Sequence, residues 1–201
     1  MNFPEVLQRI TVALDRAGVA YMLTGSFASA YYGSLRSTQD MDLVIAATPQ
    51  QLQTLIQGLP SGEYYADLDA ALEAFKRESM FKVIDLRTAW KIDMIICKSR
   101  AFSQEEFGRG QRLSLQGISL SVASAEDVIL SKLEWSKLSQ SQRQIEDAAG
   151  ILKIQRSSLN RTVSGTMDSR ARVGKRMGSC PASSQYLRSQ YLSRMNSPIE
   201  T

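Results

Sequence analysis

The sequence contains no histidine and only two cysteines among its 201 residues. The absence of histidine excludes a Ser-His-Asp or Cys-His catalytic set and any histidine-ligated zinc site. The two cysteines, Cys97 and Cys180, lie far apart in unlike surroundings, which favours free thiols in a reducing cytoplasm over a disulfide framework. Acid–base or metal chemistry must therefore use carboxylates, with Lys or Arg supplying positive charge.

The sequence also lacks the long apolar segments that membrane insertion requires. It has no apolar run of about 18 residues, so we expect no membrane span. The opening residues, MNFPEVLQRI, show no basic segment followed by an apolar one, so no signal peptide is predicted. These absences favour a cytoplasmic protein that does not bind a membrane.

Charge is distributed unevenly along the chain. Residues 155–201 carry seven Arg and one Lys against two acidic side chains, whereas residues 1–154 carry 16 basic and 18 acidic side chains. The apolar share of 43% is ordinary for a globular protein and sufficient for a core. We therefore predict one domain over 1–154, followed by a basic, Ser- and Arg-rich tail over 155–201. Two explanations of the tail stay open: a natural, poorly ordered segment or an altered reading frame.

Apolar spacing predicts a mixture of helices and strands. Helices are expected over 3–17, 26–32, 49–57, 67–76, 103–107, 125–138 and 141–153. Strands are expected over 19–23, 41–46, 81–86, 90–97, 112–115 and 118–122, the last four forming two antiparallel hairpins. In the last helix, one side carries the apolar residues expected to face inward: Ile145, Ala148, Ala149 and Leu152.

The segment 21–45 contains the residues that indicate function. Asp40 and Asp42 stand one residue apart at the start of an apolar strand, so their side chains point to the same face. A divalent cation explains such a pair better than packing does, although a loop pair with turn or capping duties is the alternative. Before them, Gly25 and Ser26 follow a strand and open a helix, where backbone N–H groups and the Ser hydroxyl can hold a triphosphate. An ordinary strand-to-helix turn is the other interpretation of this pair.

A third carboxylate, Asp93, interrupts the apolar strand 90–97. It is the candidate for helping to place a second ion and for activating an attacking hydroxyl. With Asp40 and Asp42 it would bind one or two Mg²⁺ ions, since Mg²⁺ is commonly held by carboxylates together with substrate phosphates. The alternative is a solvent-facing position opposite Lys91 or Lys82.

The order Gly25-Ser26, then Asp40-Met41-Asp42, then a distant Asp93 on its own strand resembles the DNA polymerase β-like nucleotidyltransferase superfamily. The stretch 36–42 is similar to small bacterial and archaeal members, including the minimal nucleotidyltransferase and AbiEii-like groups of toxin–antitoxin systems. The resemblance covers about 19–154. It implies an α+β fold with a small mixed sheet flanked by helices, a bound nucleoside triphosphate with Mg²⁺, and transfer of a nucleoside monophosphate to a hydroxyl. Asp40 and Asp42 would be metal ligands, Asp93 a third ligand and base, and Gly25 and Ser26 triphosphate ligands.

Basic residues add to this set. Lys132 falls near the apolar face of the helix 125–138 and could reach a triphosphate, a role that the resemblance also suggests. Alternatively, its stem covers apolar surface while its ammonium group reaches water. Arg36 either guides a phosphate or is a surface charge. Asp85, although it lies in an apolar strand, is not counted as a ligand.

Two functional hypotheses follow from the sequence. The first is a Mg²⁺-dependent nucleotidyltransferase whose acceptor is a protein, a tRNA or a small molecule, with a cognate toxin or antitoxin as a further partner. The second is a non-catalytic nucleotide-binding or antitoxin-like module that binds a partner protein. The sequence does not distinguish among the acceptors or identify the nucleotide.

Overall fold

A computed structural model describes residues 3–34, 38–156, 158 and 159 of the chain. Arg36 and nearly all of the predicted tail, including Cys180, lie outside the described residues. The chain divides into two compact units, Met1–Tyr31 with Leu35–Ser124, and Tyr32–Ser34 with Ala125–Thr201. Each unit is described in turn.

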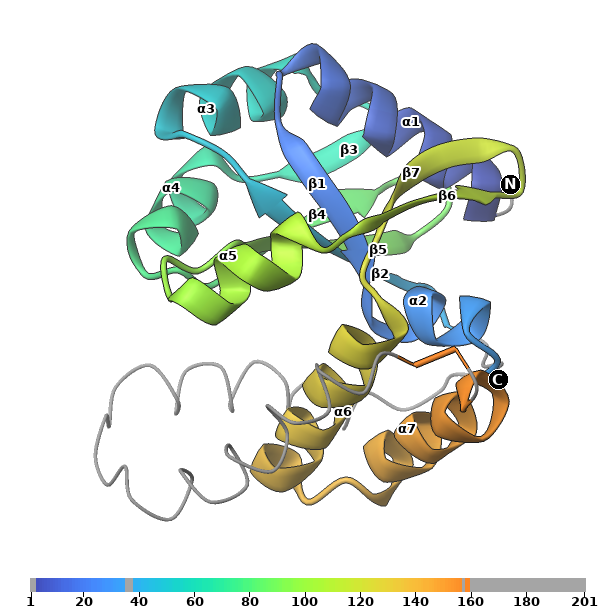
Figure 1. The fold of residues 1–201 in the computed structure, drawn as a ribbon. Coiled ribbons are helices and arrows are strands. Elements are labelled where there is room, and N and C mark those ends of the chain that lie inside the picture. Colours follow the sequence, from blue (N-terminus) through green and yellow to red (C-terminus); the bar gives the residue numbers. More distant parts are fainter. Residues whose placement is uncertain (1–2, 35–37, 157, 160–201) are drawn as a thin grey trace. The chain divides into compact units, whose positions relative to one another are not determined.

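The first unit is built on a seven-stranded mixed sheet in the order β3-β4-β5-β2-β1-β7-β6 (Figure 1). The strands are β1 (Ala20–Thr24), β2 (Asp40–Ala46), β3 (Tyr64–Ala66), β4 (Met80–Asp85), β5 (Trp90–Ile96), β6 (Gln111–Leu115) and β7 (Ile118–Val122). The pairs β4·β5 and β6·β7 are antiparallel hairpins, which confirms both predicted hairpins. The pairs β2·β5 and β1·β7 are parallel and join segments distant in sequence. The short β3 was not predicted.

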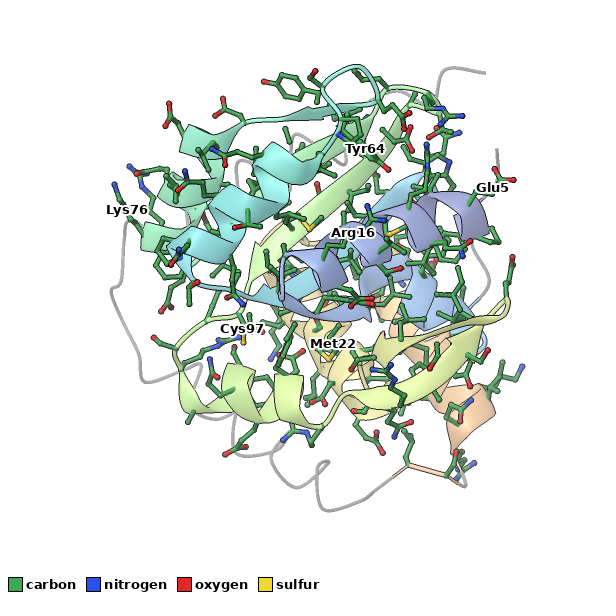
Figure 2. The ribbon with its side chains drawn as sticks, turned by 90° about the horizontal axis from the view of Figure 1, so that it is seen from above. Glu5, Arg16, Met22, Tyr64, Lys76 and Cys97 are labelled. Carbon is green, nitrogen blue, oxygen red and sulfur yellow. The ribbon has the colours of Figure 1, made fainter. Side chains whose placement is uncertain are left out.

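Five helices accompany this sheet: α1 (Phe3–Arg16), α2 (Gly25–Tyr31), α3 (Pro49–Gly58), α4 (Leu68–Lys76) and α5 (Ala101–Gly108). The predicted start of α3 is confirmed, because the Thr48 hydroxyl accepts a hydrogen bond from Gln51 N and Gln51 closes a capping box. The helix α5 is longer than the single predicted turn. Helices α1 and α3 lie on one side of the sheet, the side seen from above in Figure 2.

Alternation along the strands assigns each side chain to one face. Leu43 of β2, Ile92 of β5 and Val83 of β4 are fully buried and share the face that α1 covers. Asp85 shares this face and accepts a hydrogen bond from Arg9 of α1. Asp42, one position from Leu43, therefore points to the opposite face.

Within the described residues of the second unit, two helices pack together, α6 (Ala125–Ser139) and α7 (Gln142–Gln155). Their existence is confirmed, but the predicted inward face of α7 is wrong in part. Its buried residues are Gln144, Asp147, Ala148 and Ile151, whereas Ile145 and Leu152 are 44% and 42% exposed. Ala149 is exposed as well, so the buried side of α7 is displaced toward Asp147, which pairs with Lys132 of α6.

The observed α+β fold, a mixed sheet flanked by helices, agrees with the expectation from sequence. None of the helices in the described part of the chain has the length and apolar character that crossing a bilayer requires.

Candidate functional site

The parallel pairing of β2 with β5 brings two predicted site residues together. Asp42 is the register partner of Asp93, so the two carboxylates stand on the same face of neighbouring strands. Adjacent strands lie about 4.8 Å apart, which places the two side chains within reach of a shared ligand. Asp40 precedes Asp42 by two positions and shares that face. The three predicted carboxylates therefore come from two central strands and one face of the sheet.

The strand register also places one residue of β1 beside Asp42 and one residue of β4 beside Asp93. Thr24 of β1 is the partner of Asp42, and Lys82 of β4 is the partner of Asp93. We call these four residues, Thr24, Asp42, Asp93 and Lys82, the Asp42 row. Across the sheet, the Asp42 row presents a hydroxyl on β1, a carboxylate on β2, a carboxylate on β5 and an ammonium group on β4.

Burial separates the three carboxylates. Asp42 is 7% exposed and Asp93 is fully buried, whereas Asp40 is half-buried. All three lie within strands, so the interpretation of Asp40 and Asp42 as a loop pair is wrong. The interpretation of Asp93 as solvent-facing is also wrong, although its position opposite Lys82 is confirmed. Two adjacent, buried and ionised carboxylates repel each other, and a neighbouring positive charge relieves this repulsion.

Lys82 supplies such a charge. Its Nζ lies 3.0 Å from Asp93 Oδ1, and its side chain is 35% exposed. A hydrogen bond between charged groups at this distance holds the carboxylate in one orientation. Asp93, the predicted third metal ligand, is thus hydrogen-bonded to Lys82 of the same hairpin.

Gly25 lies directly against Asp42. It has φ +65°, and a Cβ added to it would lie 2.7 Å from Asp42 Cγ and 2.9 Å from Asp42 Cβ. A side chain at this position would be strained and would displace the carboxylate. Glycine is therefore required here for close approach of the backbone to Asp42. Ser26 is the next residue of α2 and is partly exposed.

Hydrogen bonds to nearby hydroxyl groups fix the backbone at Gly25 and at Asp40. The Ser29 hydroxyl donates to Gly25 O over 2.9 Å within α2. Asp40 N donates to Thr38 Oγ1 over 3.1 Å where the chain enters β2. These bonds hold Gly25 and Asp40 independently of the strand pairing.

The carboxylate oxygens of Asp40 and Asp42 suit a hard divalent cation. Carboxylate oxygens are the ligands Mg²⁺ prefers, and one or two of them commonly suffice when phosphates complete the coordination. Among the residues that the structure describes, no three Asp, Glu, Cys or His side chains are grouped closely enough to hold a metal by themselves. Asp40 and Asp42 fit an ion that also binds a triphosphate, and Asp93 is at the same time held by Lys82.

Lys132 belongs to the second unit and has a defined partner there. Its Nζ lies 2.6 Å from Asp147 Oδ2, and both side chains are buried. Ser34 donates to the other oxygen of Asp147 over 3.2 Å. The prediction that Lys132 lies near the apolar face is confirmed, while the alternative with a solvent-exposed ammonium group is wrong.

Asp85 lies on the other face of the sheet from Asp93, in agreement with its exclusion as a ligand. It accepts hydrogen bonds from Arg9 and from Arg87 N. The Arg9 guanidinium lies 5.7 Å from the ring centroid of Tyr64. Burial raises the pKa of Tyr64 above its usual value, and its hydroxyl finds no hydrogen-bond partner among the described residues. This cluster connects α1 to the edge of the sheet.

Two residues that contribute to the electrostatics of the site were not assigned this role from the sequence. Lys82 was named only in the alternative for Asp93, as a residue opposite it, and that position is confirmed. Asp147 was not connected with Lys132. The signal for Lys82 is present in the hairpin, where an exact register places it opposite Asp93. No sequence signal connects Lys132 with Asp147, because they lie on different helices.

Comparison with protein-family models gives no match, and no curated protein sequence matches the chain. Among solved structures, the chain is similar to the lincomycin-bound lincosamide antibiotic adenylyltransferase LnuA. The TM-score is 0.53 at 14% identity, covering 77% of this chain and 98% of that one. A second similar structure is ANT(2″)-Ia in complex with adenylyl-2″-tobramycin, with a TM-score of 0.49 at 13% identity, covering 95% of this chain and 97% of that one. At these identities the likeness to LnuA shows a shared fold, the nucleotidyltransferase fold.

Proposed function

We propose that the protein is a nucleotidyltransferase that moves a nucleoside monophosphate from a nucleoside triphosphate to a hydroxyl group of an acceptor. The observation that carries this proposal is the register of β2 with β5, which sets Asp42 beside Asp93 on the nucleotidyltransferase fold. Gly25 against Asp42 adds a backbone approach suited to phosphate.

Asp40 and Asp42 would hold Mg²⁺ through their carboxylate oxygens. When bound, Mg²⁺ neutralises triphosphate oxygens and stabilises the charge that develops in transfer. Gly25 keeps the space beside Asp42 open, and we propose that the backbone of Gly25 and Ser26 with the Ser26 hydroxyl binds the triphosphate. The protein's contribution is then mainly positioning and electrostatics.

Asp93 is the proposed acceptor of the proton from the attacking hydroxyl. The acceptor oxygen forms a bond to the α-phosphorus, the bond from that phosphorus to the bridging oxygen breaks, and pyrophosphate leaves. Since Lys82 holds Asp93 Oδ1, the orientation of Asp93 toward the acceptor would be fixed before the acceptor binds.

We also propose that Lys132 contacts the triphosphate, which requires it to give up an existing ion pair. Its ammonium group would have to leave Asp147, a buried carboxylate 2.6 Å away. If Lys132 serves the triphosphate, replacing Asp147 by Asn frees the ammonium group and tightens nucleotide binding. If its role is structural, the same replacement lowers stability alone.

We propose a small molecule with a free hydroxyl group as the first acceptor to test, because LnuA, which shares the fold, is an antibiotic adenylyltransferase bound to lincomycin. A protein hydroxyl or a tRNA end is the next candidate. Membership of a toxin–antitoxin pair is a further proposal, and copurification with the product of a neighbouring gene tests it.

A second candidate function is a nucleotide-binding or antitoxin-like module without turnover. The pair between Lys82 and Asp93 favours it, since an internal ammonium group lets the buried carboxylates coexist without a metal. Such a module would bind nucleotide or partner protein but would not transfer label.

The deciding experiment follows label from [α-³²P]ATP, GTP and CTP to acceptor panels of antibiotics, tRNA and protein in the presence of Mg²⁺. We expect labelled product from the natural chain and none from the double variant Asp40→Asn with Asp42→Asn. Glu73→Gln is the control, since Glu73 is an exposed residue of α4 paired with Arg77. Transfer that persists in the double variant would refute the assignment of the site.

A further inference from the structure

The proposed reaction gives the ammonium group of Lys82 only the task of orienting Asp93. This group lies 3.0 Å from Asp93 Oδ1, in register with Asp93 and on the same face of the sheet. The Lys82 side chain is partly buried, and its ammonium group donates to a carboxylate that is fully buried.

The neighbours of Asp93 show what this contact accomplishes. Asp42 lies beside Asp93 on the next strand, and both carboxylates are buried. Burying two like charges side by side is unfavourable unless a cation accompanies them. A divalent ion and the ammonium group of Lys82 are alternative cations for Asp93, because both bind to its carboxylate oxygens.

We infer that Lys82 is a resident cation that occupies Asp93 before nucleotide binds, so that a divalent ion is held by Asp40 and Asp42 alone. The inference rests on the proposed function and deepens it. An ion that also engages Asp93 must first displace the ammonium group. Lys82 thereby keeps the nucleotide-free protein folded without metal and weakens its affinity for a free divalent ion.

The perturbation is Lys82→Met, which removes the ammonium group and retains most of the apolar stem. In the nucleotide-free full chain, Mn²⁺ alone should then bind about tenfold more tightly, the equivalent of one charge-assisted contact that no longer has to be broken. In EDTA the variant should unfold at a lower temperature than the natural chain, and Mn²⁺ should raise its Tm more. Lys82→Arg, which keeps a positive charge beside Asp93, should restore both properties toward those of the natural chain.

The experiment measures Mn²⁺ affinity by isothermal titration calorimetry and Tm with and without Mn²⁺. Lys76→Met is the matched control for lost charge, because Lys76, labelled in Figure 2, is an exposed residue at the end of α4. Unchanged Mn²⁺ affinity in Lys82→Met, or an equal change in Lys76→Met, would overturn the inference. If Lys82→Met is unfolded in EDTA, folding on addition of Mn²⁺ supports the inference, and failure to fold in both conditions overturns it.

Asp42→Asn distinguishes failure of this inference from failure of the proposed function. If the natural chain binds Mn²⁺ and Asp42→Asn does not, the metal role of Asp42 holds whatever Lys82→Met does. If the natural chain and Lys82→Met both fail to bind Mn²⁺, the proposed metal site and the inference on Lys82 fall together.

Discussion

Replacing Gly25 by Ala tests the contact between the glycine turn and Asp42. Gly25 has φ +65°, and its added Cβ would lie 2.7 Å from Asp42 Cγ. The replacement therefore has two effects, a strained backbone and a displaced carboxylate. Gly18→Ala isolates the first effect, because Gly18 has φ +66° and its added Cβ would meet only Gln51 Nε2 at 3.5 Å, an ordinary contact.

The expected magnitudes differ between the two variants. A left-handed conformation costs an L-residue with a Cβ about 1–2 kcal/mol, which we expect for Gly18→Ala. Gly25→Ala adds a steric overlap, and overpacking of a filled site typically costs about 1–3 kcal/mol more. Because the overlap is with Asp42 itself, Gly25→Ala should also weaken Mn²⁺ binding, whereas Gly18→Ala should leave it unchanged.

Urea unfolding gives the free energy of unfolding of both variants, and calorimetry gives their Mn²⁺ affinity. The difference between the variants is the measure of the collision at Asp42. Equal destabilisation of the two, with equal Mn²⁺ affinity, would show that the side chain of Asp42 is not held against Gly25 and that the glycine serves only the turn.

Three further predictions concern stability. Asp147→Ala should lower the free energy of unfolding by about 3–5 kcal/mol because it leaves the Lys132 ammonium group buried without its carboxylate, and a loss below about 1 kcal/mol in urea unfolding would contradict the pairing. Ile151→Ala should cost about 2–5 kcal/mol, whereas Leu152→Ala should change stability by no more than about 0.5 kcal/mol, and the opposite order would restore the face of α7 expected from sequence. Tyr64→Phe should leave the free energy of unfolding nearly unchanged at pH 7. Because the pKa of Tyr64 is raised in the folded protein, the folded state favours the uncharged phenol, and the natural chain should lose stability as the pH rises through that pKa. Tyr64→Phe should reduce this loss. Identical alkaline unfolding curves for the two proteins would contradict the cause assigned to that shift.

Local patterns were sufficient to predict most of the elements and the identity of the carboxylates. The apolar spacing of α1, the Thr48-Pro49 start of α3 and the alternation in β4 are all properties of short segments. Asp40 and Asp42 could be recognised because two like charges in an apolar strand need an external reason.

The register of the strands could not be predicted in the same way. Asp42 meets Asp93 through a parallel pairing between strands that are about 50 residues apart in sequence, which no local pattern specifies. The hairpin β4·β5 is local, but a shift by one residue would place Lys82 opposite Met94 instead of Asp93. Ala89, with φ +57°, lies in the turn that sets this register and carries no glycine signal. The hairpin itself could be predicted, but the position of Lys82 in the Asp42 row depends on its exact register.

The orientation of α7 shows a similar limit. Its apolar residues suggest an inward face with Ile145 and Leu152, yet Asp147 is buried by its contact with Lys132 of α6. A contact between two helices decides which side is covered, and hydrophobic spacing within one helix does not contain that information.

The role of Asp42 in binding metal and triphosphate is tested most directly by measuring binding of an α,β-methylene nucleoside triphosphate to the full chain, with Mg²⁺ and with EDTA. This measurement needs no acceptor. We predict Mg²⁺-dependent binding that Asp42→Asn weakens by at least about tenfold, equivalent to about 1.4 kcal/mol, while Glu73→Gln leaves it unchanged. Binding with equal affinity in Mg²⁺ and EDTA, or in Asp42→Asn and the natural chain, would contradict the assignment of Asp42 to the metal–triphosphate site.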